Sequence, residues 1–476
     1  MTGRLAKIVV LAMVLLPAGR SPAQDLIPIP DFTEYRLPPS ESAQTSPRAE
    51  APWREYLDLG ALCVFLVLAT LFALKLRRRW ALLGLAVVSV LWLGFWRKGC
   101  VCPIGAIQNV GLALGDASYA IPWTVVAVFT LPLLFTLFFG RTFCAAVCPL
   151  GGVQEFVAVR PVQVPNWLEN TLGLLPWVYL GLAVLFAVTG TALVICRYDP
   201  FVGFFRLSAG TNMLILGACL LVIGVFVGRP YCRYLCPYGA ILGLFSRVSK
   251  WHVSITPDEC IQCRLCEDAC PYGAIQVPTV PQSPEERLRG RRRLALLLAA
   301  LPLLILLGVW LGWGLEVPLS RVDPTVRLAD RVLLEETDKV EGTTDASDAF
   351  RNTGRPAADL YREAQERTKM FGRAGAGFGA WVGLVIGLRL IYLSVRRRRS
   401  DYEPVRANCV ACGRCFRSCP REMLRLGLIA DVAEVVPQKE GSGVFCRNGP
   451  EGASHKRLPT PFSAQAGRSG EGDRSR

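Results

Sequence analysis

Histidine is almost absent from this chain of 476 residues, which contains only His252 and His455. Neither lies in a hydrophobic block, so a haem held by two histidines between buried helices is excluded, and a Rieske-type centre is disfavoured. The chain also lacks a Ser/His/Asp set, a phosphate-binding loop and a pair of catalytic carboxylates. These absences argue against bond-making catalysis and leave sulfur as the main ligand for any metal.

Cysteine and apolar residues are abundant: 18 cysteines and a hydrophobic fraction of 52% accompany a net charge of +15. The apolar residues fall in blocks of roughly 18–24, the length that a helix needs to cross a hydrocarbon core of about 30 Å. No basic module interleaved with aromatic residues is present, which argues against a nucleic-acid partner and for the lipid bilayer. We therefore expect a mainly α-helical polytopic membrane protein.

The apolar blocks predict seven transmembrane helices, at about residues 59–76, 80–96, 121–139, 172–195, 212–227, 294–315 and 374–395. Residues 1–24 are typical of a signal peptide cleaved after Ala23, with an uncleaved anchor as the alternative. With the chain outside after this segment, the basic clusters at 75–80, 289–293 and 396–399 fall on the cytoplasmic side, as the positive-inside rule requires. This pattern predicts a bacterial inner-membrane protein with a periplasmic N-terminus.

The other segments complete the predicted domain organisation. Residues 25–57 form a short external segment, and residues 58–250 form the membrane domain. Two ferredoxin halves at 251–288 and 397–437 flank a transmembrane hairpin at 289–396, whose acidic, helix-prone external loop at about 316–373 is expected to be a solvated cap. The tail at 438–476 is rich in Gly, Ser, Pro and charge and is expected to be disordered.

Two copies of C-x2-C-x2-C-x3-C-P identify the ferredoxin halves, because this spacing is that of bacterial ferredoxins, in which the fourth cysteine binds the other cluster. One [4Fe–4S] cluster is therefore predicted at Cys260, Cys263, Cys266 and Cys419, and a second at Cys409, Cys412, Cys415 and Cys270. Zinc is the competing metal for these cysteines. A cytoplasmic location disfavours disulfides between them. The result is a cytoplasmic ferredoxin-like α+β module split by a helical hairpin.

A second repeated motif, G-R-x-[FY]-C-x3-C-P-[LY]-G, occurs at residues 140–151 and 228–239. Each copy follows a predicted span that descends to the cytoplasm. Two cysteines cannot complete a cubane but two pairs can, so the motif predicts a third [4Fe–4S] cluster at Cys144, Cys148, Cys232 and Cys236. The alternative is that these thiols are structural.

Three further cysteines, Cys100, Cys102 and Cys196, are expected at the external face, across the membrane from the other motifs. A disulfide from Cys196 to Cys100 or Cys102 suits an oxidising compartment; contact with an external metal or flavin would make the group the external end of an electron path. Nearby, Tyr198 and Asp199 fit a helix-end turn better than proton release beside a quinone. Cys63 and Cys219 are expected to pack as small apolar residues inside spans, and Cys446 has no predicted role.

Together, these motifs make residues 57–425 resemble the NosR/NapH-type membrane polyferredoxins, which carry several membrane helices, two Cys-x3-Cys-Pro motifs and a ferredoxin pair. The resemblance implies a membrane electron carrier that couples a quinol or cytoplasmic donor to a periplasmic respiratory reductase or its maturation, as an electron-transfer component rather than a stand-alone enzyme. The external flavin-binding domain of NosR-type proteins and an S/T-G-A-T flavinylation sequence are not found here. A flavin, if used, would come from a periplasmic partner.

Two other functions remain open at the sequence level. One is a redox sensor whose cluster state regulates transcription or assembly. The other is a maturation factor of the cytochrome-oxidase accessory (CcoG-like) kind, which reduces copper. Relatives of that kind end in an immunoglobulin-like domain, whereas this chain ends in a segment with the composition of a disordered tail.

Overall fold

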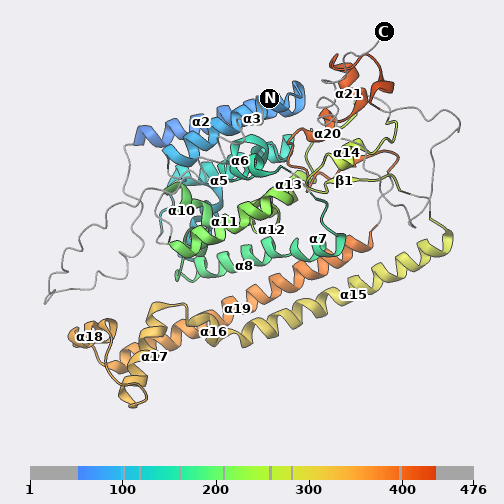
Figure 1. Ribbon diagram of the computed structural model, residues 1–476. Helices are drawn as coiled ribbons and strands as arrows, with labels where there is room; N and C mark the ends of the chain where they lie inside the picture. Colours follow the sequence, from blue (N-terminus) through green and yellow to red (C-terminus); the bar gives the residue numbers. More distant parts are fainter. Residues whose placement is uncertain are drawn as a thin grey trace, which may run out of the picture.

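Long apolar helices lie side by side along one direction, with a small module at one end of the bundle and a helical cap at the other (Figure 1). This computed structural model describes residues 52–97, 99, 102–116, 119–159, 162–206, 210–256, 260–279, 282–395 and 399–435. The predicted signal peptide and disordered tail, together with Cys100, Cys446 and His455, lie outside the described residues. The module consists of the segments around the two ferredoxin-type cysteine runs.

Each predicted transmembrane block contains a helix. These are α2 (Pro52–Thr70) continued by the π-helical η2 (Leu71–Lys75), α3 (Arg79–Ser89) continued by η3 (Val90–Trp96), α5 (Trp123–Phe139), α7 (Asn166–Leu172) followed by α8 (Leu175–Val188), α11 (Thr211–Phe226), α15 (Pro284–Gly314) and α19 (Ala357–Ser394). Among the described residues, five helical segments are long and apolar enough to cross a membrane. The helices at the other two blocks, α5 and α11, have 17 and 16 residues, so the count of seven spans stays a prediction.

The hairpin of α15 and α19 extends well beyond the predicted spans at 294–315 and 374–395. A capping box of Ser283 and Glu286 starts α15 ten residues early, and the helix-prone end of the external loop joins α19 without a break. Between them lie α16 (Glu316–Ser320), α17 (Pro324–Glu336) and α18 (Asp345–Asn352), which form the cap. A Cβ atom at Gly379 would clash with the carbonyl oxygen of Gly308, so glycine permits the close approach of the two helices.

Short helices follow the cysteine motifs of the membrane domain, and the sequence did not predict them. They are α4 (Pro103–Gly115), α6 (Pro149–Val157), α10 (Pro200–Arg206) and α13 (Pro237–Ser246). Each begins with proline, which suits the first helical position because no N–H partner is needed there. Cysteine occupies the preceding N-cap of three of them, at Cys102, Cys148 and Cys236. Three shorter elements carry the other cysteines of these motifs: η4 (Phe143–Val147), α9 (Val194–Tyr198) and α12 (Pro230–Tyr234).

The module at the end of the bundle joins two halves that are far apart in sequence. Strands β1 (Ile275–Gln276) and β2 (Glu403–Pro404) pair antiparallel, with Ile275 opposite Pro404. Its helices are α14 (Leu265–Asp268), α20 (Arg414–Arg417), α21 (Pro420–Arg425) and the 3₁₀ turn η5 (Val432–Glu434). The hairpin therefore brings both halves to the same end of the bundle, as the split-ferredoxin hypothesis requires.

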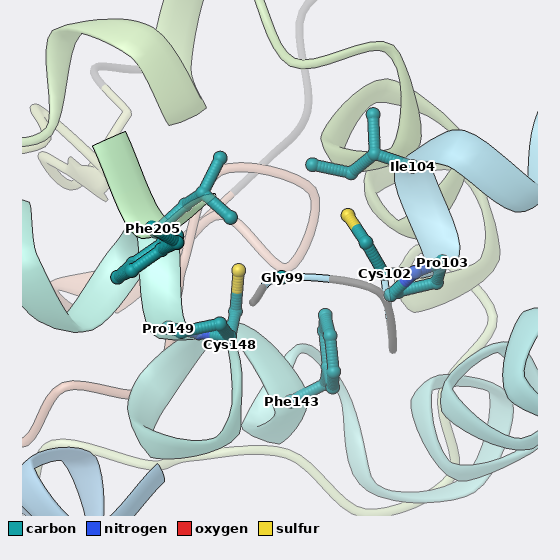
Figure 2. A pocket seen from close by; sticks show the side chains of 9 residues that line it. Gly99, Cys102, Pro103, Ile104, Phe143, Cys148, Pro149 and Phe205 are labelled. Carbon is teal, nitrogen blue, oxygen red and sulfur yellow. The ribbon is translucent and has the colours of Figure 1, made fainter. Parts of the chain in front are cut away.

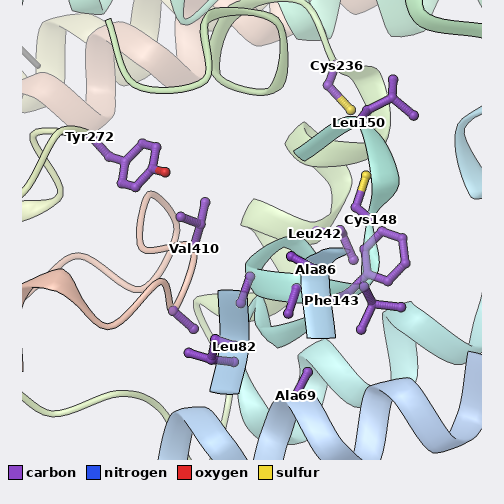
Figure 3. Packing of buried hydrophobic residues seen from close by; sticks show 14 of the residues in the cluster. Ala69, Leu82, Ala86, Phe143, Cys148, Leu150, Cys236, Leu242, Tyr272 and Val410 are labelled. Carbon is purple, nitrogen blue, oxygen red and sulfur yellow. The ribbon is translucent and has the colours of Figure 1, made fainter. Parts of the chain in front are cut away.

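One hydrophobic core runs from the helix bundle into this module (Figure 3). It includes Ala69 and Leu82 from the long helices, Leu242 from α13, and Tyr272 and Val410 from the module. Cys148 and Cys236 belong to the same cluster. The cysteine motifs are therefore packed within the protein interior and are held by both the bundle and the module.

Candidate iron–sulfur centres

The first predicted ligand set lines a single cavity in the module. Cys260, Cys263, Cys266 and Cys419 surround an empty volume of about 310 Å³. The loop that carries the first three turns tightly, because Gln262 and Arg264 have left-handed φ values of 53° and 64°. The N–H of Gln262 lies 3.4 Å from Cys260 Sγ and donates to it. Such N–H donors stabilise the negative charge of a cluster and its thiolates.

The second predicted set lines a neighbouring cavity. Cys270, Cys409, Cys412 and Cys415 surround an empty volume of about 340 Å³. Here too the loop turns through left-handed residues, Ala411 with φ 53° and Gly413 with φ 78°. Burial raises the pKa of the Cys409 thiol to about 12, so in the absence of a bound metal this thiol is protonated at neutral pH. Cluster binding at this set would therefore release protons, as thiolate ligation generally does.

The third predicted set comes together from the two Cys-x3-Cys-Pro motifs. Cys144, Cys148, Cys232 and Cys236 line an empty volume of about 310 Å³ at the start of α6 and α13. The Gly239 N–H donates to Cys236 Sγ across 3.3 Å, and Gln154 Nε2 donates to Cys232 Sγ across 3.3 Å. Arg141 Nη2 lies 3.8 Å from Cys144 Sγ. These donors and a guanidinium group compensate negative charge on sulfur, which four buried thiolates around a cluster would create.

The donor sets fit iron–sulfur clusters better than single ions. A zinc site needs four ligands about 2.0–2.3 Å from one ion, and no three His, Cys, Asp or Glu side chains within the described ranges converge in that way. Each of the three sets instead provides four thiols around a larger space, with N–H donors directed at sulfur. A [4Fe–4S] cluster requires such a donor set.

A buried carboxylate, Glu155, connects the second and third sets. In α6, its Oε1 accepts hydrogen bonds from Arg414 at 2.8 Å and Arg79 at 3.1 Å, and its Oε2 accepts from Arg229 at 3.2 Å. Tyr272 Oη also donates to Oε2, at 2.5 Å. Burial alone would raise the pKa of Glu155, but the three guanidinium groups lower it well below its usual range. Glu155 is therefore ionised at neutral pH and ties the module to the membrane domain.

The two neighbouring sets are close enough to share a cation. Arg229, which is 1% exposed, interacts electrostatically with both Cys232 and Cys412. Arg141, which contacts Cys144, also donates through Nη1 to the Ala407 carbonyl at 2.9 Å, just before Cys409. The second and third sets are therefore adjacent, and the four arginines around Glu155 and Cys144 lie between or beside them.

Cys102 is not separated from the third set, contrary to the sequence-based expectation. Cys102 and Cys148 line the same cavity, together with Phe143 and Phe205; Figure 2 shows both sulfur atoms on this cavity. That expectation placed Cys100 and Cys102 beyond the end of a complete transmembrane span at residues 80–96. Instead, Gly99 adopts a left-handed φ of 65° and α4 starts at Pro103 inside the bundle, which places Cys102 in the interior.

The other cysteines lie apart from these cavities. Cys196 is exposed in α9, close to Gly105 of α4. Cys102 carries a free thiol, so the disulfide considered between Cys196 and Cys102 is not formed, and the alternative with Cys100 lies outside the described residues. Cys63 is half-buried in α2 and Cys219 is exposed in α11; neither lines a cysteine cavity described above.

Sequence reasoning missed the residues that support the cysteines, namely Gln154, Glu155, Arg229 and Tyr272. Gln154 could have been found, because C-P-x-G-x-x-Q occurs at 102–108 and again at 148–154. Glu155 could not, because its partners Arg79, Arg229 and Arg414 lie 76, 74 and 259 residues away.

Comparison with known proteins identifies the family. A family model described as a 4Fe-4S binding domain matches residues 121–169 and 209–256, and a second model of the same description matches residues 253–276. The first two segments contain both Cys-x3-Cys-Pro motifs. A protein of Methanocaldococcus jannaschii, MJ0750, is 32% identical over 187 residues, which cover 37% of this chain and 75% of that protein. The chain belongs to the NosR/NapH-type 4Fe–4S membrane ferredoxins.

Two named members show the extent of the similarity. NirI of Paracoccus denitrificans is 27% identical over 297 residues, which cover 56% of this chain and 43% of NirI. The regulatory protein NosR of Pseudomonas aeruginosa is 27% identical over 283 residues, which cover 52% of this chain and 38% of NosR. The chain thus spans less than half the length of these two relatives. No solved structure matches the chain. This membrane ferredoxin therefore contains 4Fe-4S binding domains, as its sequence predicted.

Proposed function

We propose that this membrane ferredoxin carries electrons through three [4Fe–4S] clusters between a cytoplasmic or quinol donor and a periplasmic redox partner. The observation that carries the proposal is that three separate cavities are each lined by four cysteines. In the proposed order, the Cys260/Cys419 set comes first, the Cys270/Cys409 set second and the Cys144/Cys232 set third, because Arg229 interacts with a cysteine of each of the last two sets. Electrons would pass through them one at a time.

The clusters supply one-electron redox chemistry when bound, and the chain's own residues position and tune them. N–H groups of Gln262 and Gly239 and the amide of Gln154 donate to cysteine sulfur, which stabilises added negative charge. Arg229 lies between the second and third sets and interacts with a cysteine of each. The positive charge of Arg229 would stabilise an added electron on either of the two neighbouring clusters. The barrier to electron transfer between them would therefore stay low.

The proposed orientation places the module in the cytoplasm and the cap of α16–α18 in the periplasm. It is supported by the arginine clusters that flank the helices at the module end and by the position of cap and module at opposite ends of the bundle (Figure 1). In a bacterial inner membrane, the quinone pool would then be accessible from the bilayer. A periplasmic reductase, its maturation pathway or a flavin-bearing carrier would be the external partner.

Iron stoichiometry tests the proposal. Full-length protein purified anaerobically should contain about twelve irons and twelve acid-labile sulfides per chain, four for each cubane. Cys144→Ser should remove about four irons and one EPR signal while both ferredoxin-type signals remain. Cys63→Ser is the matched control, because this cysteine also lies in the membrane domain but lines no cysteine cavity described here. About eight irons in the wild type, unchanged in Cys144→Ser, would refute the third cluster.

A regulatory function is the second candidate, because two relatives are named regulatory proteins. In that case the clusters would report a redox state and would not sustain electron flow. Reduction of all clusters by a quinol in reconstituted membranes, followed by repeated reoxidation by a periplasmic-side acceptor, distinguishes the two. A single reduction without turnover would favour regulation.

A further inference from the structure

Two arginine side chains from different helices meet on one aromatic ring near the module end of the bundle. Arg247 is the C-cap residue of α13, and its guanidinium carbon lies 5.2 Å from the centre of the Tyr392 ring in α19. Arg389, three residues before Tyr392, lies 5.8 Å from the same centre. Each cation is attracted to the ring, but the two positive charges repel each other. The pair is therefore a local concentration of positive charge.

No carboxylate neutralises this charge within the described part of the chain, where neither arginine forms an ion pair. Arg389 Nη2 donates to the Asn170 side-chain oxygen at 2.9 Å, while its buried Nε has no partner among the described residues. Glu169, which adjoins Asn170 in α7, is already engaged by Arg233, whose Nη2 lies 2.8 Å from Oε2. The hydrogen-bonding capacity of the Arg389 guanidinium is thus only partly used, and an anion is missing.

The arginine pair lies where the apolar surface of the bundle gives way to the module. Arg389 is five residues before Ser394, the last residue of α19, which corresponds to about 8 Å along the helix axis. Ser246, next to Arg247, donates through Oγ to the carbonyl of Arg406 in the module at 2.7 Å. Long arginine side chains at such a position reach the headgroup layer of a membrane.

The residues around the pair are apolar and exposed. Leu244 and Val248 lie on either side of Arg247 in sequence, and Leu393 follows Tyr392; all three are exposed. Trp251, a residue type that is enriched at membrane interfaces, is exposed nearby in sequence. The surface therefore offers a cationic pair for a headgroup together with an apolar wall for acyl chains.

We propose that Arg247 and Arg389 bind the phosphate group of an anionic phospholipid, whose acyl chains lie along the exposed apolar residues of α13 and α19. Guanidinium groups bind phosphate oxygens through charge-assisted, often bidentate hydrogen bonds. Basic pockets between membrane helices bind anionic headgroups in the same way. A zwitterionic lipid is a poorer ligand, because its own cation would lie near the arginines. The site requires only that the bundle spans a membrane and does not depend on the number of clusters.

A lipid phosphate at this point would strengthen the contact between the hairpin and the rest of the membrane domain. Two side-chain hydrogen bonds of α19 reach α7 and α8: Arg389 donates to Asn170, and Trp381 Nε1 donates to the Trp177 carbonyl at 2.8 Å. Arg247 belongs to α13, so a phosphate between the two arginines would connect a further helix to α19. Binding of the lipid should therefore stabilise the folded protein.

Thermal unfolding of the full-length protein in detergent, followed by tryptophan fluorescence, tests the site. Phosphatidylglycerol should raise the midpoint in a saturable manner, whereas phosphatidylcholine and inorganic phosphate should not. Arg247→Gln should need about tenfold more phosphatidylglycerol for the same increase, because a charge-assisted hydrogen bond is worth roughly that factor in affinity. Lys250→Gln is the matched control: it removes one positive charge three residues away, from an exposed side chain that lies over Trp251.

Native mass spectrometry gives a second measurement that does not depend on stability. The wild type and Lys250→Gln should retain a phosphatidylglycerol molecule that Arg247→Gln and Arg389→Gln lose. An equal response of wild type and Arg247→Gln to phosphatidylglycerol would overturn the site and show a general effect of membrane charge. An equal effect of phosphatidylcholine would reduce the contact to its apolar part, and the same increase with inorganic phosphate would identify a soluble anion as the ligand; either result would contradict the lipid assignment.

Discussion

Replacing Glu155 by glutamine tests the connection between module and membrane domain. The change removes the negative charge of a carboxylate that is shared by three arginines. The side chain of Arg229 is 1% exposed, and those of Arg79 and Arg414 are 16% and 15% exposed. Breaking a buried ion pair by removing one partner costs about 3–5 kcal/mol. Glutamine still accepts hydrogen bonds, so we expect a loss of stability at the lower end of this range, about 3 kcal/mol.

The assay is thermal loss of the visible iron–sulfur absorbance in detergent under anaerobic conditions. For a folding unit of 150–250 residues, about 3 kcal/mol corresponds to a decrease of roughly 6–12 °C in the midpoint. Glu363→Gln is the control, because Glu363 pairs with Arg355 at 3.5 Å and both side chains are 40% or more exposed. An exposed pair of this kind is worth less than about 1 kcal/mol.

The same variant has a distinct pH dependence. The folded pKa of Glu155 is lowered from 4.5, so its contribution to stability is complete above pH 4.5 and is lost as the pH falls below that value, by about 1.4 kcal/mol per pH unit. The wild type should therefore approach the stability of Glu155→Gln only when the pH is about two units below 4.5, whereas the difference should be constant above pH 5.5 or so. A midpoint for Glu155→Gln within roughly 2 °C of the wild type at neutral pH would refute the assigned role.

The crossed ligand sets, the helical hairpin and the orientation each allow a direct test. Cys270→Ser should abolish the EPR signal of the set with Cys409 and leave the other ferredoxin signal; loss of the opposite signal would contradict the crossed assignment. Gly379→Leu should force α15 and α19 apart and cost about 1–3 kcal/mol, whereas Gly377→Leu, with open space at its Cβ position, should be neutral; equal midpoints would disprove the close packing. Asp345→Cys in α18 should react with an impermeant maleimide only from the periplasmic side, and labelling from the cytoplasm alone would reverse the orientation.

The cysteine sets could be predicted from sequence because ligand spacing is local and the motif is repeated. The C-x2-C-x2-C run places three sulfurs around one loop wherever it occurs, and the two Cys-x3-Cys-Pro copies share flanking residues over twelve positions. The position of Cys102 could not be predicted in the same way. Counting spans treats every apolar block as a full crossing, whereas here a turn at Gly99 and a proline-started helix return the chain into the bundle. Such a return depends on packing against Phe205, which no local pattern records.

The short helices explain how cysteines can lie away from both ends of the bundle. At 1.5 Å per residue, the 9 residues of α6 extend about 14 Å and the 13 residues of α4 about 20 Å, each less than a hydrocarbon core of about 30 Å. The N-cap cysteine of each therefore lies well inside the bundle, while the other end points outward: α6 toward the module through Glu155, α4 away from it at Gly115. Because Cys102 and Cys148 line one cavity, the starts of the two helices meet in the interior of the bundle. A cluster held by Cys148 would then lie inside the bundle, so an electron would not need to cross the whole bilayer in a single transfer.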